Sequence, residues 1–464
     1  MTSPAGMRLH LVGIGGAGMS GLARLLLGRG MAISGSDAAA TREIPALRRL
    51  GARIHIGHDA RRLPRGIDGV VVSSAIPVDN VEVVAARERG CAVIPRLDAL
   101  GTLMDTRRSI GVAGTHGKTT TAAMLTTILR FAGLQPSHYI GEHCPGLGSR
   151  AGADAGSWLV AEIDESDGRF VQLQPELAVL TSVDYDHAGA YGSMAAIESA
   201  FASYLAGAKQ RVLCIDDPRV LALAASHPAA YTAGFHPHAR VRCLQAEGDG
   251  GGMRFLLDAD GERVGWVPLP APGVHNVRNA LCAIAAAVAA GVPPGIAAWG
   301  LSRFVRPSRR FEVLARGEIT VVDDFAHHPE EIQMTVRAAR SIWSDRRLVC
   351  VFQPHRFSRT QQLAERFGMS FTGADAVVVT DIYPAGETPL PGVTSRQVVD
   401  AISRSAPGLE SRWIPDAGAL HRHLQDTLDP GDVVLGLGAG DLSAIMHDLA
   451  NSVAGTARGR CGSR

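Results

Sequence analysis

Residues 109–121 constrain the fold more than any other segment. An apolar run from Ser109 to Ala113 leads into a loop with two glycines that ends in Lys118-Thr119, and a helical pattern follows as far as Phe131. A strand, a glycine loop and a helix in this order form a phosphate-binding loop, in which backbone N–H groups approach phosphate oxygens. The segment therefore predicts a parallel α/β sheet that binds ATP or GTP. The expected nucleotide contacts are Gly114, Thr115, His116, Gly117, Lys118, Thr119 and Thr120.

Two residues of this loop carry specific expectations. Lys118 should contact the β- and γ-phosphates, and the Thr119 hydroxyl should be a ligand of Mg²⁺. The usual G-x-x-x-x-G-K-[ST] spacing needs a glycine at position 112, where this chain has Val112. A tight strand-to-helix turn with a solvent-exposed lysine is the alternative interpretation.

Short apolar runs alternate with helical patterns in three blocks of the chain. This βα repetition predicts parallel, doubly wound sheets. We expect a three-domain α/β protein: an N-terminal Rossmann-like domain at 1–107, a central P-loop ATPase-like domain at 108–312 and a C-terminal Rossmann-like domain at 313–464. Within the central block, alternating segments at 240–268 are separated by glycine-rich turns and predict a small antiparallel insert.

Composition excludes several classes of protein. The chain has 464 residues, is 46% hydrophobic and 20% charged, and carries a formal net charge of +1, so nothing suggests binding to nucleic acid or an acidic membrane surface. No apolar stretch approaches the roughly 18 residues of a membrane span, and the N-terminus does not look like a signal peptide. The seven cysteines are scattered without a C-x-x-C pair, which favours a reducing, cytoplasmic setting. Monomer and homodimer both stay open.

The first block opens with a second glycine loop. Gly13 to Gly21 follows an apolar run and contains a G-x-G-x-x-G pattern, and Asp37 follows at the distance of a ribose-binding acid. The loop fits the diphosphate of a sugar nucleotide or of a dinucleotide, and structural glycines are the alternative. Ser73 begins a turn after another strand, where a hydroxyl could contact the same ligand or simply form the turn. The expected contacts of the loop are Gly15, Gly16, Ala17, Gly18, Met19 and Ser20.

Acidic and histidine residues follow two strands of the central block. Glu162 is the first of four acids after an apolar run, and we expect it to hold Mg²⁺, because the ion prefers hard oxygen ligands. His187 closes a similar Ser182–His187 segment and is either a metal ligand or a structural histidine. Further along, His275 and Asn276 begin an alanine-rich helix, where Asn276 could cap the helix or contact an adenine.

The third block adds two more polar clusters at strand ends. Asp323 to Pro329 contains two acids and two histidines, and Asp324 and His327 could contact a ribose, a phosphate or a nucleophile. A carboxylate clamp is plausible in the second cluster because guanidinium groups bind carboxylates through two hydrogen bonds, although a basic surface turn fits the same residues. The clamp residues are His355, Arg356 and Arg359. Arg310, in the preceding linker, could reach a γ-phosphate or be a plain linker charge.

Taken together and in this order, these motifs resemble those of the Mur ligase family over roughly residues 7–450. The resemblance accounts for Val112, because that family has a shortened Gly-Thr-His-Gly-Lys-Thr loop. It implies ATP-dependent ligation of L-alanine to the lactyl carboxylate of UDP-N-acetylmuramate through an acyl phosphate, with Mg²⁺ or Mn²⁺. Position 201 is Phe, where many relatives have a carbamylated lysine, so no such lysine is expected.

The resemblance also implies roles for the residues above. Lys118, Glu162, His187, Arg310 and His327 would be catalytic, and Thr119, Glu162 and His187 would hold the metal. The glycine loop, Asp37 and Ser73 would bind the UDP part, and His275, Asn276 and Asp324 would bind ATP. His355, Arg356 and Arg359 would fix the alanine carboxylate.

Four alternatives remain. The ligase that recycles a preformed tripeptide onto the same sugar nucleotide usually has Cys-Gly-Thr where this chain has Gly16-Ala17-Gly18. A folate polyglutamate ligase would share the fold. An NAD-dependent oxidoreductase would use the first block and leave the phosphate loop unexplained. A non-catalytic nucleotide-binding regulator would have no use for the C-terminal clamp.

Overall fold

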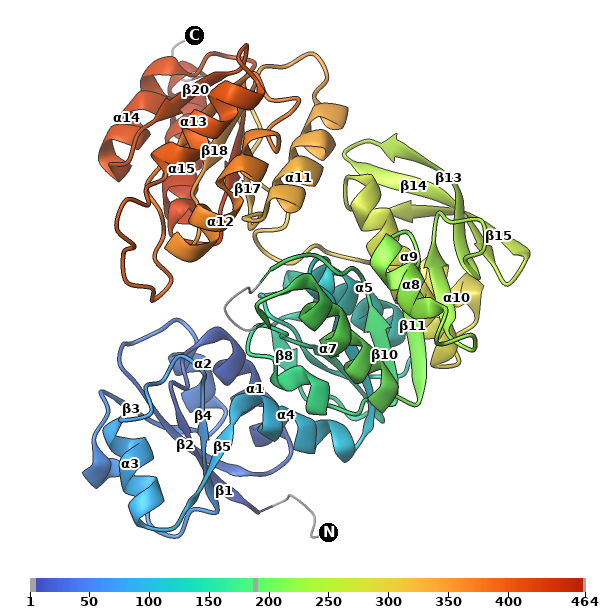
Figure 1. Ribbon diagram of the computed structural model, residues 1–464, viewed down its shortest axis with the longest axis vertical. Coiled ribbons are helices and arrows are strands. Elements are labelled where there is room, and N and C mark those ends of the chain that lie inside the picture. The colour runs from blue at the N-terminus through green and yellow to red at the C-terminus, as the bar shows by residue number, and fades with distance from the viewer. Residues whose placement is uncertain (1–5, 187–190, 462–464) are drawn as a thin grey trace. The chain divides into compact units, whose positions relative to one another are not determined.

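The computed structural model describes residues 6–186 and 191–461, with side chains described as far as residue 454. It contains three sheets flanked by helices, which confirms the predicted α/β class (Figure 1). The chain separates into two compact units. One comprises Met1–Ala246, Phe255–Leu269 and Asn276–Pro307, and the other Glu247–Arg254, Pro270–His275 and Ser308–Arg464.

The first sheet has five parallel strands in the order β3-β2-β1-β4-β5. Neighbouring residues of β4 face opposite sides: Val71 packs with helices α1, α2 and α4, whereas Val70 packs with α3. The order reverses beside β1, and ligands bind outside the carboxyl ends of strands at such a point. The elements are β1 (Arg8–Val12), α1 (Ala17–Gly28), β2 (Ala32–Asp37), α2 (Ile44–Arg49), β3 (Arg53–Ile56), β4 (Gly69–Val72), α3 (Val81–Glu88), β5 (Ala92–Pro95) and α4 (Arg96–Asp105).

The second sheet has ten strands in the order β15-β14-β13-β12-β11-β10-β6-β9-β7-β8. Its centre is parallel, with β6 between β10 and β9. The first elements are β6 (Arg108–Ala113), α5 (Lys118–Phe131), β7 (Ser137–Tyr139), β8 (Ala151–Gly152), β9 (Trp158–Glu162), β10 (Leu177–Leu180), α7 (Met194–Gly207), β11 (Gln210–Cys214) and α8 (Pro218–Ala224). The others are β12 (Tyr231–Gly234), β13 (Val241–Asp249), β14 (Gly252–Ala259), β15 (Glu262–Leu269), α9 (Val274–Ala289) and α10 (Pro294–Leu301).

The predicted antiparallel insert corresponds to β13, β14 and β15. These strands continue the edge of the second sheet, because β13 pairs in parallel with β12. Two residues connect β13 to β14 and two connect β14 to β15, and connections this short join only antiparallel strands.

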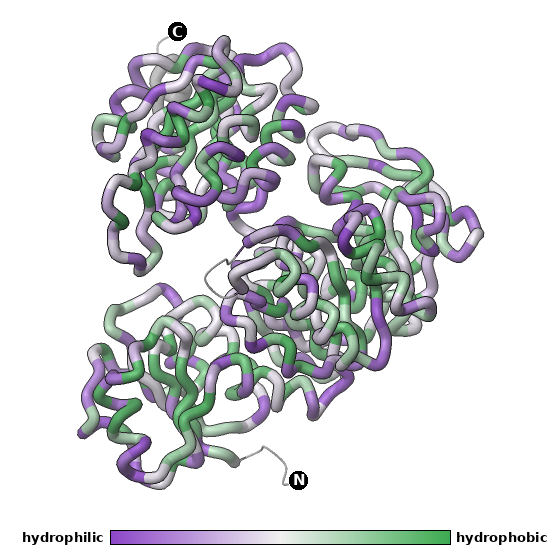
Figure 2. The backbone as a smooth tube through the Cα atoms, in the orientation of Figure 1, coloured by the Kyte–Doolittle hydropathy of each residue, from purple (hydrophilic) through white to green (hydrophobic). Residues whose placement is uncertain are grey.

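The third sheet has six strands in the order β16-β17-β21-β18-β19-β20. Val377 of β19 packs with α11, α12 and α13, and Val378 packs with α14 and α15 on the opposite face. Figure 2 shows hydrophobic segments concentrated in the strands of the sheets. The elements are β16 (Glu312–Ala315), β17 (Thr320–Asp324), α11 (Pro329–Ile342), β18 (Leu348–Phe352), α12 (Phe357–Gly368), β19 (Ala376–Val379), α13 (Arg396–Ser405), β20 (Glu410–Trp413), α14 (Ala417–Thr427), β21 (Val433–Leu437) and α15 (Leu442–Cys461).

Two edge strands of the third sheet were not predicted. β16 pairs antiparallel with β17, and β20 is the polar segment Glu410–Trp413. Among the described helices, none combines the length and the apolar character that crossing a membrane requires.

Candidate active site

The phosphate loop has the predicted strand, loop and helix. Val112 is buried inside β6, so the loop begins only after Ala113 and is shorter than the usual pattern. Helix α5 begins at Lys118, and Gly117 caps it with a φ of +85°. Gly117 needs to be glycine on two grounds, since a Cβ there would also clash with Asn279 Oδ1. Gly114 has a φ of +130°, and its Cβ would clash with Thr181 Oγ1.

Lys118 is held firmly in the loop. Its Nζ donates to the carbonyl oxygens of Gly114 (2.6 Å) and Thr115 (3.1 Å) and to Glu165 Oε1 (2.8 Å). Burial lowers the pKa of Lys118, but attraction to Glu165, Glu162 and Asp164 outweighs burial and raises it above its usual value. The ammonium group is therefore charged at neutral pH, and all three of its N–H donors are used.

Glu162 lies against the start of α5. The Thr119 hydroxyl donates to Glu162 Oε1 over 2.8 Å, and Gly141 N donates to Glu162 Oε2 over 2.6 Å. The two residues expected to share a Mg²⁺ ion thus lie side by side although they are 43 positions apart. A hydroxyl and a carboxylate are the hard oxygen donors that this ion prefers.

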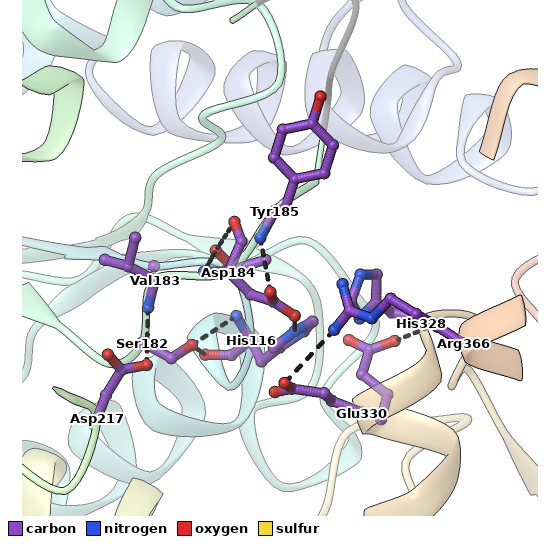
Figure 3. A network of polar contacts seen from close by, with 12 residues as sticks. His116, Ser182, Val183, Asp184, Tyr185, Asp217, His328, Glu330 and Arg366 are labelled. Atoms are coloured by element: carbon purple, nitrogen blue, oxygen red, sulfur yellow. Dashed lines mark hydrogen bonds and ion pairs between the residues drawn. The ribbon is translucent and has the colours of Figure 1, made fainter. Parts of the chain in front are cut away.

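The segment after β10 supports the loop from the other side (Figure 3). His116 N donates to Ser182 Oγ over 3.0 Å, and Asp184 N donates to Thr115 Oγ1 over 2.8 Å. Asp184 Oδ2 also lies 3.5 Å from His116 Nε2. The strand-exit placement predicted for this segment is confirmed, while His187 lies outside the described residues.

The glycine loop of the first sheet is fixed by β2. Gly15 N donates to Asp37 Oδ2 over 2.8 Å, and the N–H groups of Gly13 and Ile14 donate to Ser36 O. One Asp37 carboxylate oxygen is thus already bound to the loop. Ser20 is fully buried, and its hydroxyl donates to Ala17 O.

Both loops open into one cleft of about 280 Å³ within the first unit. It brings together most of the residues predicted for the sugar nucleotide with Lys118 and Glu162 from the phosphate-binding half. Gly15, Ser20 and Asp37 are not among its lining residues. The lining consists of Gly16, Ala17, Gly18, Met19, Ser73, Ser74, Arg96, Lys118, Tyr139, Gly141, Glu162 and Asp164.

Sequence reasoning did not single out Arg96, Tyr139 or Asp164. Arg96 donates from Nη1 to the Tyr139 hydroxyl (2.7 Å) and from Nη2 to Asp164 Oδ2 (2.9 Å). Burial alone would raise the pKa of Asp164, but Arg96 and Ser166 hold it at about 2, so this carboxylate is charged. Arg96 could have been found by its position, because it directly follows the carboxyl end of β5.

The role of Asn276 as a helix cap is wrong. Helix α9 begins at Val274, so Asn276 lies inside its first turn. The turn comes earlier than predicted because Gly273, with a φ of +90°, precedes the helix. Asn276 is buried, and its Oδ1 accepts a hydrogen bond from Asn279 Nδ2 over 3.2 Å. Since Asn279 lies against Gly117, this pair borders the phosphate loop.

In the second unit, Asp324 organises the turn before β16. Its Oδ2 accepts from Phe311 N (2.7 Å) and its Oδ1 from Ala326 N (2.8 Å). Burial raises the pKa of Asp324 to about 6, although Arg310 and the two N–H groups oppose the rise. Arg310 also stacks 5.0 Å from the ring of Phe325.

The predicted clamp residues lie together at the start of α12. Arg359 Nη1 lies 3.2 Å from His355 Nδ1, and the His355 ring stacks on Tyr383 with centroids 5.6 Å apart. His327 packs edge-on against His355 at 5.4 Å. Arg356 has a φ of +72°, a conformation that costs energy in a residue with a side chain. Such strain is common at functional sites.

Known proteins resemble the chain over nearly its whole length. It is 43% identical to the UDP-N-acetylmuramate–L-alanine ligase of Xanthomonas oryzae pv. oryzae, across 96% of this chain and 95% of that protein. The ligase of the same name from Solidesulfovibrio magneticus is also 43% identical, across 94% of this chain and 96% of that protein.

Solved structures of two ligases also resemble the chain over nearly its whole length. The UDP-N-acetylmuramate–alanine ligase of Thermotoga maritima superposes with a TM-score of 0.82 at 27% identity, covering 97% of this chain and all of that one. A murein peptide ligase from Psychrobacter arcticus has the same fold, with a TM-score of 0.70 at 24% identity, covering 96% of this chain and 98% of that one.

Three family models match successive segments. They are described as "Mur ligase family, catalytic domain" at residues 8–108, "Mur ligase middle domain" at 112–287 and "Mur ligase, glutamate ligase domain" at 309–440. The resemblance inferred from the motifs is confirmed, and the chain belongs to the Mur ligase family.

Proposed function

We propose that this chain uses ATP to join L-alanine to the lactyl carboxylate of UDP-N-acetylmuramate, releasing ADP and phosphate. The reaction is the first amino-acid addition in peptidoglycan precursor synthesis, and so serves cell wall biogenesis, cell shape and division. The relatives that are 43% identical over more than nine-tenths of the chain carry this activity in their names.

One observation carries the proposal most directly. The glycine loop of the first sheet, Lys118 and Glu162 line a single cleft, and the Thr119 hydroxyl is hydrogen-bonded to Glu162. A dehydrogenase would need only the first loop, and a simple nucleotidase only the second. A cleft that both loops border can hold the carboxylate of a sugar nucleotide beside the γ-phosphate of ATP.

The chemistry requires such a meeting, because a carboxylate does not react with an amine until one of its oxygens becomes a good leaving group. A lactyl carboxylate oxygen attacks the γ-phosphorus, the bond to the β-phosphate oxygen breaks, and an acyl phosphate and ADP form. The alanine amine then attacks the acyl carbon and phosphate leaves. Lys118, charged and fixed, stabilises the negative charge that spreads over the transferring phosphoryl group.

Thr119 and Glu162 fit a divalent cation, since a hydroxyl and a carboxylate lie together at the start of α5. Mg²⁺ or Mn²⁺ held there would neutralise phosphate charge. His187 remains a proposed third ligand.

The remaining assignments are part of the same proposal. The glycine loop, Asp37 and Ser73 bind the UDP part, and His275, Asn276 and Asp324 serve ATP. Arg310 and His327 assist catalysis, and His355, Arg356 and Arg359 bind the alanine carboxylate. We keep the domain limits 1–107, 108–312 and 313–464, a cytoplasmic setting and a monomer or homodimer as inferences of the same kind.

The test is phosphate release from ATP by the full chain. We expect release only when UDP-N-acetylmuramate and L-alanine are both present, and amide formation in equal amount. Release without the amino acid would identify a nucleotidase, and no release with the complete mixture would contradict the proposal. Release with a preformed tripeptide in place of L-alanine would instead favour the recycling ligase.

A further inference from the structure

Arg96 and Tyr139 connect the two halves of the cleft. The Tyr139 hydroxyl lies 3.0 Å from Gly18 O, and because a carbonyl only accepts, the hydroxyl donates there. The same hydroxyl accepts from Arg96 Nη1, while Arg96 Nη2 pairs with Asp164. One chain of polar contacts therefore runs from the glycine loop of the first sheet to the acidic loop after β9.

Two glycines of the first loop leave room for the Arg96 and Tyr139 side chains. A Cβ on Gly18 would lie 2.7 Å from Arg96 Nη1 and 2.9 Å from the Tyr139 hydroxyl. A Cβ on Gly21 would lie 3.0 Å from the Tyr139 ring. These glycines therefore let the guanidinium group pack directly against the loop.

Of the two cationic side chains that line the cleft, Arg96 has N–H donors beyond those used in the two contacts above. Two cations, Arg96 and Lys118, line the cleft, and Lys118 uses its three N–H groups for Gly114 O, Thr115 O and Glu165 Oε1. A guanidinium has five N–H donors, and the contacts to Tyr139 and Asp164 use two of them. The Arg96 side chain keeps 14% of its surface exposed, so a ligand in the cleft can reach it.

We propose that Arg96 binds an anionic oxygen of the sugar nucleotide and that Tyr139 is the positioning residue that holds the guanidinium group against the glycine loop. This inference rests on the proposed function. The oxyanion belongs either to the diphosphate or to the lactyl carboxylate, because Arg96 lies between the glycine loop and the acidic loop. Guanidinium groups bind both through paired hydrogen bonds.

Titration calorimetry on the full chain tests the inference. Arg96→Lys keeps the charge and loses the planar fork, and Arg96→Gln loses the charge. We expect both to weaken UDP-N-acetylmuramate binding by about 10-fold or more, with unchanged affinity for an ATP analogue. The matched control is Arg169→Lys, because Arg169 pairs with Asp98 of α4 outside the cleft. It should leave both affinities unchanged.

A second ligand identifies the oxyanion. UDP-N-acetylglucosamine has the diphosphate and lacks the lactyl carboxylate. Equal losses for both sugar nucleotides in Arg96→Lys support a contact to the diphosphate, and a loss confined to UDP-N-acetylmuramate supports a contact to the carboxylate. Unchanged affinity for both ligands in both Arg96 variants overturns the inference.

Tyr139→Phe tests the positioning role. It keeps the ring against Gly21 and removes the hydroxyl, so we expect the KM for UDP-N-acetylmuramate to rise several-fold while kcat and the KM for ATP stay constant. An equal loss in every parameter, or a lowered melting temperature with no selective change in KM, contradicts positioning. If the unmodified chain does not bind UDP-N-acetylmuramate at all, the proposed function fails; if it binds and the variants bind equally well, only this inference fails.

Discussion

The Thr119 hydroxyl donates a hydrogen bond to Glu162 Oε1 over 2.8 Å, joining the first turn of α5 to the end of β9. The pair places a hydroxyl and a carboxylate where the phosphate loop meets the cleft. An ion bound there would replace this hydrogen bond with two oxygen ligands.

Glu162→Gln should separate metal binding from folding. The amide keeps one acceptor oxygen for Gly141 N, and its NH2 group can donate to the Thr119 hydroxyl, but the negative charge is lost. We therefore expect kcat to fall about 100-fold and to recover partly at high Mg²⁺ concentration. UDP-N-acetylmuramate affinity should change little. Glu176→Gln, which removes a surface partner of Arg108, is the matched control. A kcat within about threefold of the original at ordinary Mg²⁺ concentration would argue against a role for Glu162 in metal binding.

Gly117→Ala should abolish nucleotide binding. The substitution places a side chain at a φ of +85° and into Asn279 Oδ1, so the loop must shift. Gly133→Ala is the control, because Gly133 has a φ of +78° with open space around it. Both variants should lose about 1 kcal/mol of stability from the backbone conformation. Only Gly117→Ala should lose ATP binding, as measured by fluorescence with a labelled ATP analogue, and equal effects on binding would refute a specific role for the loop.

Local sequence patterns were sufficient to predict the helices and strands that have a strong hydrophobic periodicity. β6, the phosphate loop and α5 are consecutive, so their identity could be read from one segment. β16 and β20 were not predicted, because both are edge strands of only four residues and neither contains a fully buried residue. β20, with Glu410, Ser411 and Arg412, looks like a surface turn in the sequence.

Site residues that directly follow the carboxyl end of a strand could be predicted from the sequence. Site residues whose role depends on contacts with distant parts of the chain could not. Glu162 and Ser73 were identified by that rule. Tyr139 was not, because the role proposed for it depends on Arg96, which lies 43 positions earlier at the start of α4. The start of α9 was misplaced because the backbone turns at Gly273, three residues before the predicted cap.

Asp324→Asn should remove a pH dependence of stability. The pKa of Asp324 rises from 3.8 to about 6 on folding, so the native protein binds more protons than the unfolded chain between these values. The free energy of unfolding should therefore fall as pH rises from 4 to 7, by about 2 kcal/mol from this group. Urea unfolding of the variant should lack this component.

The control for that series is Asp375→Asn. Burial would raise the pKa of Asp375, but its partners Leu348 N and Arg340 lower it below 3.8. Its stabilisation is therefore fully present above about pH 4 and changes with pH only below that value. The decrease in the free energy of unfolding between pH 5 and 7 should remain in this variant. If Asp324→Asn keeps the full slope, the carboxyl group is not the source.

Arg359→Lys should raise the KM for L-alanine selectively. Arg359 is 7% exposed, and its Nη1 lies 3.2 Å from His355 Nδ1 at the start of α12. A lysine keeps the charge and cannot form two parallel hydrogen bonds to a carboxylate, so we expect a KM about 10-fold higher or more, with the KM for ATP unchanged. Arg366→Lys is the matched control on the same helix, since Arg366 is more exposed and pairs with Glu330 at 3.6 Å. Steady-state phosphate release over a series of L-alanine concentrations gives the comparison. Equal behaviour of the two variants would place the alanine carboxylate elsewhere, whereas a selective effect of Arg359→Lys that glycine and L-serine share would show that the clamp binds the carboxylate common to all three amino acids.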